Sequence, residues 1–424
     1  MPENLIAFVR QAWNALVERH FFLPPLPEQI DSLALFSLLL IVGLMIGEWL
    51  HTRAGWPKVI GYVLAGMLFG PAMLGWIGDD TLLQAKPIAD AALGLLMLEV
   101  GRRLDLGWLL RTPELLRSTL ADIVLSFGLI LLFAHFVVGL SPAWAGATAA
   151  VTMASAPAVV LLTVEESRAQ GQVTERIILH TAIGAAASFL AFPLVLGIVH
   201  VEQSSDWLSA FVHPLWIAGG ATLVAGLGAR LALLVARFVP RRSLAQVFVL
   251  VASAMLAVGL ARMLAVPVFL TLFLMGVLLA ANDKKQTLRY TALPEGHWLL
   301  AIVLFVIVGA ALPWRDFTWL VGVQAVGLLL VRALAKTVAQ LVVGSSLSYR
   351  KSLLVGLGTQ PLSATAVFMA YEIVNLYPDV GRSALALPLF AAAIMELAGP
   401  ALCRLAVKLA GETESGTARQ GGIA

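Results

Sequence analysis

Two bases and a histidine lie inside long apolar runs of this sequence, where their side chains could do chemistry. Arg332 and Lys336 are four residues apart in the run 317–343, and His180 lies in the run 177–201 with Thr181 beside it. An isolated charge in such surroundings costs several kcal/mol. A histidine titrates near neutral pH and could carry a proton, although a neutral ring bonded to a carbonyl is the simpler reading.

Bases inside an apolar run require acidic partners. Three acids within or near apolar runs are candidates: Glu99, Glu372 and Glu396. Glu99 could instead pair with Arg102 or Arg103 one turn further on, and we favour that local pairing. Asp122, close to one end of its apolar run, is expected at the membrane interface.

Two apolar runs are interrupted in the middle by breakers and polar residues. The run 143–164 contains 152–157 (TMASAP), and the run 352–374 contains 356–363 (GLGTQPLS). Glycine permits unwinding and proline removes a backbone donor. In lipid such breaks are tolerated only inside protein or beside a water-filled cavity, and paired breaks indicate a transport site. The polar groups nearest the predicted site are Thr152, Ser155, Gln360 and Ser363.

The elements that position these residues are predicted to be membrane-spanning helices. Charged residues make up 12% of the 424-residue chain and apolar residues 60%, which excludes a soluble enzyme and a nucleic-acid-binding protein. A span needs about 20 apolar residues. Thirteen segments qualify: 33–50, 59–76, 87–101, 120–140, 143–164, 177–201, 208–235, 244–260, 266–281, 297–312, 317–343, 352–374 and 384–409.

The distribution of basic residues supports this count. Of the 28 Lys and Arg, 19 fall in odd-numbered connections and the C-terminal tail, and six in the N-terminal segment and even-numbered connections. The positive-inside rule then puts the N-terminus outside and the C-terminus in the cytoplasm, in a plasma (inner) membrane. The fifth and twelfth spans run in opposite directions, as an inverted-topology repeat requires. The fold class is therefore an all-α polytopic membrane protein with two crossed discontinuous helices.

Three regions are expected along the chain. Residues 1–30 are predicted to be an amphipathic interfacial segment, with packing of this helix against a partner chain as the alternative. Residues 31–410 are predicted to be the transmembrane domain and 411–424 a disordered cytoplasmic tail. Dinucleotide-binding, P-loop, HExxH and CxxC motifs are absent from the sequence, so we expect no cofactor, no bound metal and no enzymatic activity.

Five short segments, rich in glycine and apolar residues, form an ordered series: 61–75 (GYVLAGMLFGPAMLG), 94–101 (GLLMLEVG), 276–280 (GVLLA), 305–310 (FVIVGA) and 331–336 (VRALAK). Together they resemble the monovalent cation/proton antiporter superfamily, especially its Kef-type branch. The resemblance covers roughly residues 33–409. It implies a core bundle with the two crossed helices, a scaffold bundle that forms a homodimer, and exchange of Na⁺ or K⁺ for H⁺ by alternating access.

This sequence departs from the family pattern at its acidic positions. The acids that the family carries on the sixth helix fall on Ala185 and Ala186, and its signature Glu after the third helix falls on Arg103. We therefore expect an atypical site built from Ser, Thr and Gln oxygens, His180 and the two bases. An anion or organic-acid transporter on the same fold, and a non-transporting membrane partner or sensor, remain alternatives.

Overall fold

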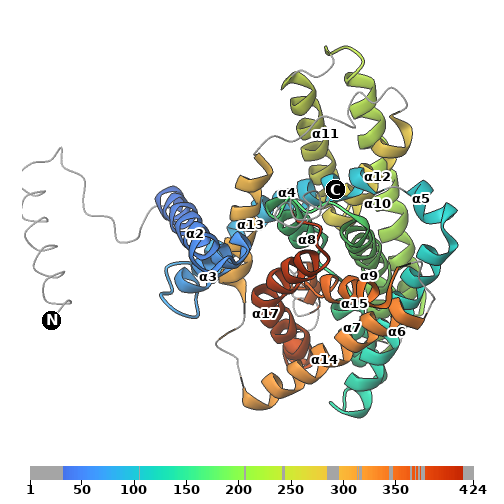
Figure 1. Cartoon of the computed structure of the whole chain (residues 1–424). Helices are drawn as coiled ribbons and strands as arrows, with labels where there is room; N and C mark the ends of the chain where they lie inside the picture. Colours follow the sequence, from blue (N-terminus) through green and yellow to red (C-terminus); the bar gives the residue numbers. More distant parts are fainter. Residues whose placement is uncertain are drawn as a thin grey trace, which may run out of the picture.

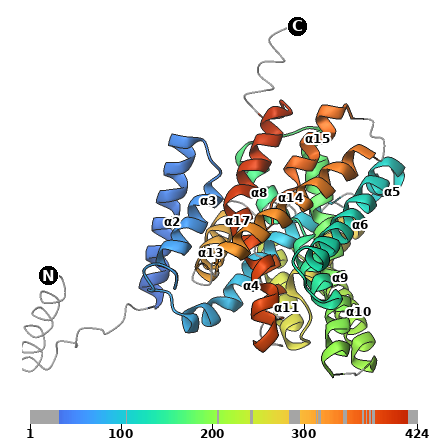
Figure 2. The ribbon, with the colours of Figure 1, turned by 90° about the horizontal axis from the view of Figure 1, so that it is seen from below.

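The computed structural model describes residues 32–413 except 105, 205–206, 241–243, 284–295, 313, 315–317, 343–346, 363–364, 368, 371–372 and 374–377. The predicted N-terminal amphipathic segment lies outside these residues. Regular structure in the described part is helical, and it divides into two bundles that lie side by side (Figures 1 and 2).

The first bundle, here called the scaffold bundle, has a tightly packed interior. Its helices are α2 (Ser32–Ala54), α3 (Lys58–Phe69), α4 (Asp79–Arg103), α10 (Trp207–Val235), α11 (Leu244–Met263), α12 (Val268–Asn282) and α13 (Gly296–Ala311). A Cβ on Gly101 would lie 2.2 Å from the carbonyl oxygen of Phe273, and one on Gly276 would lie 2.3 Å from that of Leu98. Only glycine lets α4 and α12 approach this closely, which explains why glycine occupies these positions.

The second bundle, here called the core bundle, contains both interrupted helices. Its members are α6 (Pro113–Phe136), α7 (Pro142–Thr152), α8 (Pro157–Glu166), α9 (Gln172–Ser204), α14 (Trp319–Val342), α15 (Tyr349–Gly358) and α17 (Pro378–Leu409). The short α5 (Leu106–Arg111), which the sequence did not predict, leads from α4 to α6.

The described helices include seven that are long and apolar enough to cross a membrane, and three shorter apolar ones. The predicted number of thirteen spans stays a prediction. The most apolar stretch of the broken helix formed by α7 and α8 is 100% buried, whereas the corresponding stretch of α6 is only 28% buried. The unwound backbone is therefore enclosed by protein, and continuous helices such as α6 carry the apolar surface suited to lipid.

The start of the predicted tail belongs to the packed part of the molecule. Glu412 is buried, and its carboxylate accepts hydrogen bonds from the backbone amides of Val173 and Thr174, at 3.0 and 2.8 Å. The orphan amides at the beginning of α9 are satisfied in this way. The prediction of a disordered tail from residue 411 is thus corrected for its first residues, and 414–424 lie outside the described part.

Candidate functional site

The two helix breaks meet at the centre of the core bundle. The hydroxyl of Ser155 donates to the carbonyl oxygen of Thr359 at 2.9 Å, and the amide of Ala156 donates to that of Pro361 at 2.9 Å. Both bonds join residues that are more than 200 positions apart in the chain. The predicted crossing of interrupted helices is therefore present in the structure.

Arg332 extends from α14 into this crossing and contacts both unwound segments. Its guanidinium donates to the carbonyl oxygens of Thr152 at 2.8 Å, Ala154 at 2.7 Å and Gln360 at 2.6 Å. The Gln360 side chain also accepts, at 3.1 Å. Helices α7 and α15 both end here, so two negative dipole ends converge on one fixed positive charge. Arg332 thus neutralises the crossing from within the protein.

Lys336, one turn along α14, pairs with Asp122 on α6. Its ammonium lies 3.2 Å from both carboxylate oxygens, and the hydroxyl of Ser126 donates to one of them at 2.9 Å. Asp122 is 2% exposed and Lys336 1%. The expectation that Asp122 is interfacial was therefore wrong, because α6 begins at Pro113 and carries Asp122 more than two turns into the bundle.

His180 is completely buried one turn from this pair. Its Nε2 lies 3.3 Å from the hydroxyl of Ser118, and its Nδ1 lies 3.3 Å from that of Thr119 and 3.4 Å from the Gln340 amide nitrogen. The ring is thus held by α6 and α14 together. Thr181 takes no part in this cluster, since its hydroxyl donates to the Ile177 carbonyl of its own helix at 2.8 Å.

Of the three acids considered as partners of the two bases, Glu99 forms the local pairs that the sequence favoured. Glu99 pairs with Arg102 at 2.9 Å and with Arg103 at 3.0 Å, as the local alternative predicted. Glu396 is buried on α17, and no ion pair joins it to either base in the described residues. Glu372 and Ser363 lie outside the described residues. Ala185 of α9 is buried in the apolar core, and Ala186 is partly buried and packs against that core.

Asp122 is the residue that sequence reasoning missed. The missed signal is a four-residue repeat of polar side chains on otherwise apolar α6, formed by Glu114, Ser118, Asp122 and Ser126. This spacing puts the four side chains on one helix face, which must then meet polar groups of another helix. The search for charged residues that need a partner inside an apolar run, which singled out Arg332 and Lys336, would have found Asp122 if it had included all of α6.

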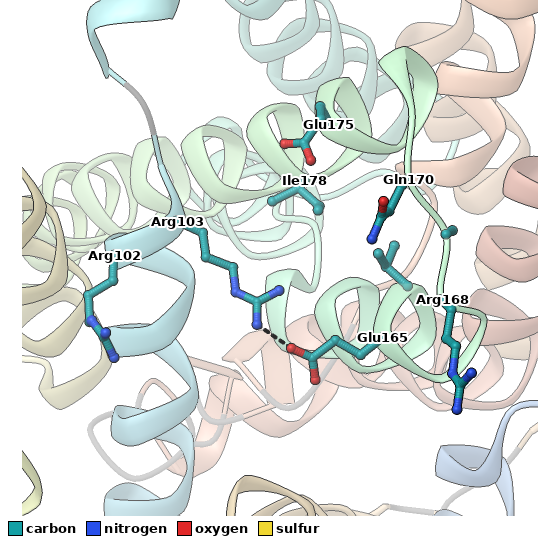
Figure 3. A pocket seen from close by; sticks show the side chains of 9 residues that line it. Arg102, Arg103, Glu165, Arg168, Gln170, Glu175 and Ile178 are labelled. Atoms are coloured by element: carbon teal, nitrogen blue, oxygen red, sulfur yellow. Dashed lines mark hydrogen bonds and ion pairs between the residues drawn. The ribbon is translucent and has the colours of Figure 1, made fainter. Parts of the chain in front are cut away.

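A pocket of about 680 Å³ opens where α4 of the scaffold bundle faces α8 and α9 of the core bundle (Figure 3). Arg103 extends from the end of α4 to Glu165 at the end of α8, and the two side chains form an ion pair across the pocket. Glu175 and Ile178 border it from α9. The pocket thus lies on the boundary between the bundles, spanned by opposite charges.

Further charged contacts join the bundles beside this pocket. Glu166 of α8 lies 2.5 Å from His51 of α2 and accepts from the Lys58 amide of α3 at 3.1 Å, and Arg404 of α17 lies 3.8 Å from it. The ends of α2, α4, α8 and α17 therefore meet on one side of the molecule. This side, which carries the pocket and these charged residues, is called the basic face below.

Two bundles around crossed, interrupted helices and a buried ion pair define an integral membrane protein with the fold of cation/proton antiporters. The chain matches the family described as "Sodium/hydrogen exchanger, transmembrane" over residues 37–399, and so belongs to it. This confirms the resemblance to the monovalent cation/proton antiporter superfamily.

Individual relatives agree with this assignment. The glutathione-regulated potassium-efflux system protein KefC of Salmonella typhi is 27% identical over 392 residues, which cover 87% of this chain and 59% of KefC. This chain thus spans less than two thirds of that relative. Two structures of the sodium proton antiporter MjNhaP1 from Methanocaldococcus jannaschii match with TM-scores of 0.65 and 0.68 at 18% identity, covering 89% and 90% of this chain and 95% and 98% of theirs. These structures show the likeness of the fold.

Proposed function

We propose that this protein exchanges a monovalent cation, K⁺ or Na⁺, for a proton by alternating access around the helix crossing. The observation that carries the proposal is the buried Asp122–Lys336 pair, one turn of α14 from Arg332 and the crossing. Hard monovalent cations prefer oxygen ligands, and a carboxylate both neutralises the cation and supplies such oxygens. In this protein Asp122 on α6 takes the role of the acids that the family pattern has at the positions of Ala185 and Ala186.

The pair supports a charge-balanced exchange. In the proton-loaded form, Asp122 is ionised and Lys336 is an ammonium, so the site is neutral overall. An entering cation takes the place of the ammonium beside the carboxylate, and Lys336 releases one proton and stays as a neutral amine. Cation plus carboxylate is again neutral, which keeps the charge of the buried site constant through the cycle. The oxygens of Ser126, Thr152, Ser155 and Gln360 would complete the ligand shell.

The orientation follows from the basic face. By the positive-inside rule this face is cytoplasmic in a plasma (inner) membrane, with the N-terminus outside. The pocket between the bundles is then the cytoplasmic opening towards the site. The scaffold bundle would form the interface of a homodimer, while the core bundle moves against it.

The alternative of an anion or organic-acid transporter loses its main motivation. It rested on Arg332 and Lys336 as uncompensated bases. The guanidinium of Arg332 is engaged by carbonyl oxygens of both breaks, and Lys336 by Asp122. Neither base offers a free positive charge to an anion, whereas the carboxylate of Asp122 suits a cation.

Reconstituted liposomes test the proposal. The purified protein is inserted into vesicles with an imposed pH gradient, and dissipation is followed after addition of Na⁺, K⁺ or Li⁺. We expect dissipation by at least one cation in the wild type and a loss of at least tenfold in Asp122→Asn and Lys336→Gln. Asp90→Asn is the matched control, because Asp90 lies on α4 of the scaffold bundle beside Arg262.

Three results would contradict the proposal. Absence of dissipation by all three cations between pH 5 and 9 would show that the protein does not exchange these cations for protons. Wild-type rates in Asp122→Asn would show that Asp122 is not part of the cation site. Thermal stabilisation by anions but not by cations, lost in Lys336→Gln, would favour the anion transporter, and a stable complex with another protein without any flux would favour a partner or sensor.

A further inference from the structure

A buried column of polar side chains runs along the contact of α6, α9 and α14. At the basic face, Arg176 of α9 pairs with Glu114 of α6 at 2.9 Å. One turn deeper, His180 meets the hydroxyls of α6 and the Gln340 side chain of α14. One further turn brings Lys336 of α14 and its partner on α6. Each helix contributes polar side chains at successive turns, so neighbouring levels of the column are about 5.4 Å apart along the helix axis.

This column and the pocket lie on different faces of α9. A helix turns by about 100° per residue, so His180 is about 140° from Glu175 and about 160° from Ile178, the α9 residues that line the pocket. Around the axis of α9, Ala185 lies about 20° from Ile178, and Ala186 lies about 20° from Glu175. The positions at which the family pattern has acids therefore face the pocket side, whereas His180 faces α6 and α14.

From this separation we propose that His180 carries protons between the basic face and the Asp122–Lys336 pair, on a route distinct from the pocket that admits the cation. The proposal rests on the proposed antiport function and deepens it. An imidazole can accept a proton at one nitrogen and release one from the other. Both nitrogens of His180 already face hydroxyls, and the pair is one turn away on both neighbouring helices.

The proton transfer balances without any further reactant. When a cation takes its place beside Asp122, the ammonium of Lys336 gives one proton to His180, which becomes an imidazolium. The imidazolium passes a proton from its other nitrogen towards the basic face, where Arg176 and Glu114 end the column, and water accepts it. When exchange runs in the opposite direction the same steps take place in reverse at this face, and His180 finishes neutral in both directions.

The charges around His180 suit an imidazole that is protonated only transiently. Asp122 on α6 attracts the proton, whereas Lys336 on α14 and Arg176 on α9 itself repel it. Ser118, Thr119 and Gln340 are its polar neighbours. A fully buried imidazolium is costly, and its repulsion by Lys336 is absent while Lys336 is a neutral amine, which is the state that follows cation entry.

The test compares His180→Gln with the wild type in the liposome assay. Glutamine keeps a polar side chain against Ser118 and Thr119 but does not titrate in this range. We expect the exchange rate to fall about tenfold or more, the pH dependence of the rate to change, and the H₂O/D₂O rate ratio to rise as proton transfer becomes limiting. Thermal stabilisation of the protein by the transported cation should stay at the wild-type level.

A control and a milder variant guard against an effect of misfolding. His135→Gln changes another histidine, on α6, whose Nδ1 lies 2.8 Å from its neighbouring Leu140 carbonyl, and should leave rate and pH profile unchanged. The near-isosteric double variant Ser118→Ala/Thr119→Val removes both hydroxyls and should slow exchange several-fold.

The possible results separate this proposal from the antiport function. Wild-type rate and pH profile in both His180→Gln and the double variant, with Asp122→Asn inactive, would overturn the proton route and leave the antiporter intact. Loss of cation stabilisation in a folded His180→Gln would assign His180 to the cation site instead. Absence of exchange in the wild type would overturn both.

Discussion

The guanidinium of Arg332 donates to the carbonyl oxygen of Thr152 at 2.8 Å, across 180 residues of sequence. The same guanidinium reaches Gln360 on the other interrupted helix at 2.6 Å. Two helix ends with converging negative dipoles are thereby joined through one positive charge. Arg332 is thus the counter-ion of the crossing, whereas in the proposed exchange Lys336 is the base that gives up its proton.

Replacement of Arg332 by methionine should destabilise the folded protein strongly. Methionine fills much of the space but leaves the carbonyls of Thr152, Ala154 and Gln360 without donors, so a cost of about 3–5 kcal/mol is expected. Thermal unfolding in detergent measures the change. Arg230→Met, at an exposed position of α10, is the matched control and should have little effect. Equal melting temperatures for both variants would contradict the assigned role.

The close contact of α4 and α12 leads to a second prediction. Gly276→Ala places a methyl group 2.3 Å from the Leu98 carbonyl oxygen, and because backbone atoms cannot move aside cheaply we expect a loss of about 1–3 kcal/mol. Gly259→Ala on α11 meets nothing within 4 Å and should stabilise its helix by up to about 1 kcal/mol. Opposite shifts in unfolding temperature confirm the packing, and a stabilised Gly276→Ala would refute it.

The sequence predicted the interrupted helices and their crossing because glycine, proline and hydroxyl residues in an apolar run leave few physical alternatives. It also predicted that Arg332 and Lys336 need compensation. It did not predict the partners, since compensation of Arg332 comes from backbone carbonyls, which carry no mark in the sequence. Asp122 was missed for a different reason: its distance from the start of the apolar run understated its depth, because α6 begins before the run does.

The ion pair of Arg103 and Glu165 should break or shift during transport. It joins α4 of the scaffold bundle to α8 of the core bundle, so any movement of one bundle against the other changes the distance between the two residues. A reversible bis-thiosulfonate cross-link in Arg103→Cys/Glu165→Cys should stop cation/proton exchange, and a reductant should restore it. The single native cysteine, Cys403, is buried and should not compete for the reagent.

A cross-link within one bundle is the control for this experiment. Asp90 of α4 and Arg262 of α11 lie 3.9 Å apart at their charged atoms, and both belong to the scaffold bundle. Cross-linked Asp90→Cys/Arg262→Cys should therefore exchange at the rate of its unlinked form. Full exchange by the linked Arg103→Cys/Glu165→Cys protein would show that α4 and α8 do not separate.

Glu412 leads to the last prediction, which concerns the C-terminal end of the described chain. Its carboxylate accepts from the amides of Val173 and Thr174 and from the Thr174 hydroxyl at 2.8 Å, and so caps the helix that carries His180. Glu412→Gln keeps part of the hydrogen bonding but loses the charge at a positive helix end, and Glu412→Ala loses both. We expect losses of about 0.5–1 and about 1–2 kcal/mol in thermal unfolding. Glu202→Gln, near the other end of α9 beside Ser141, should change stability by less than about 0.5 kcal/mol because its contact is long and exposed. Identical melting temperatures for Glu412→Ala and the wild type would show that the end of the chain does not hold α9.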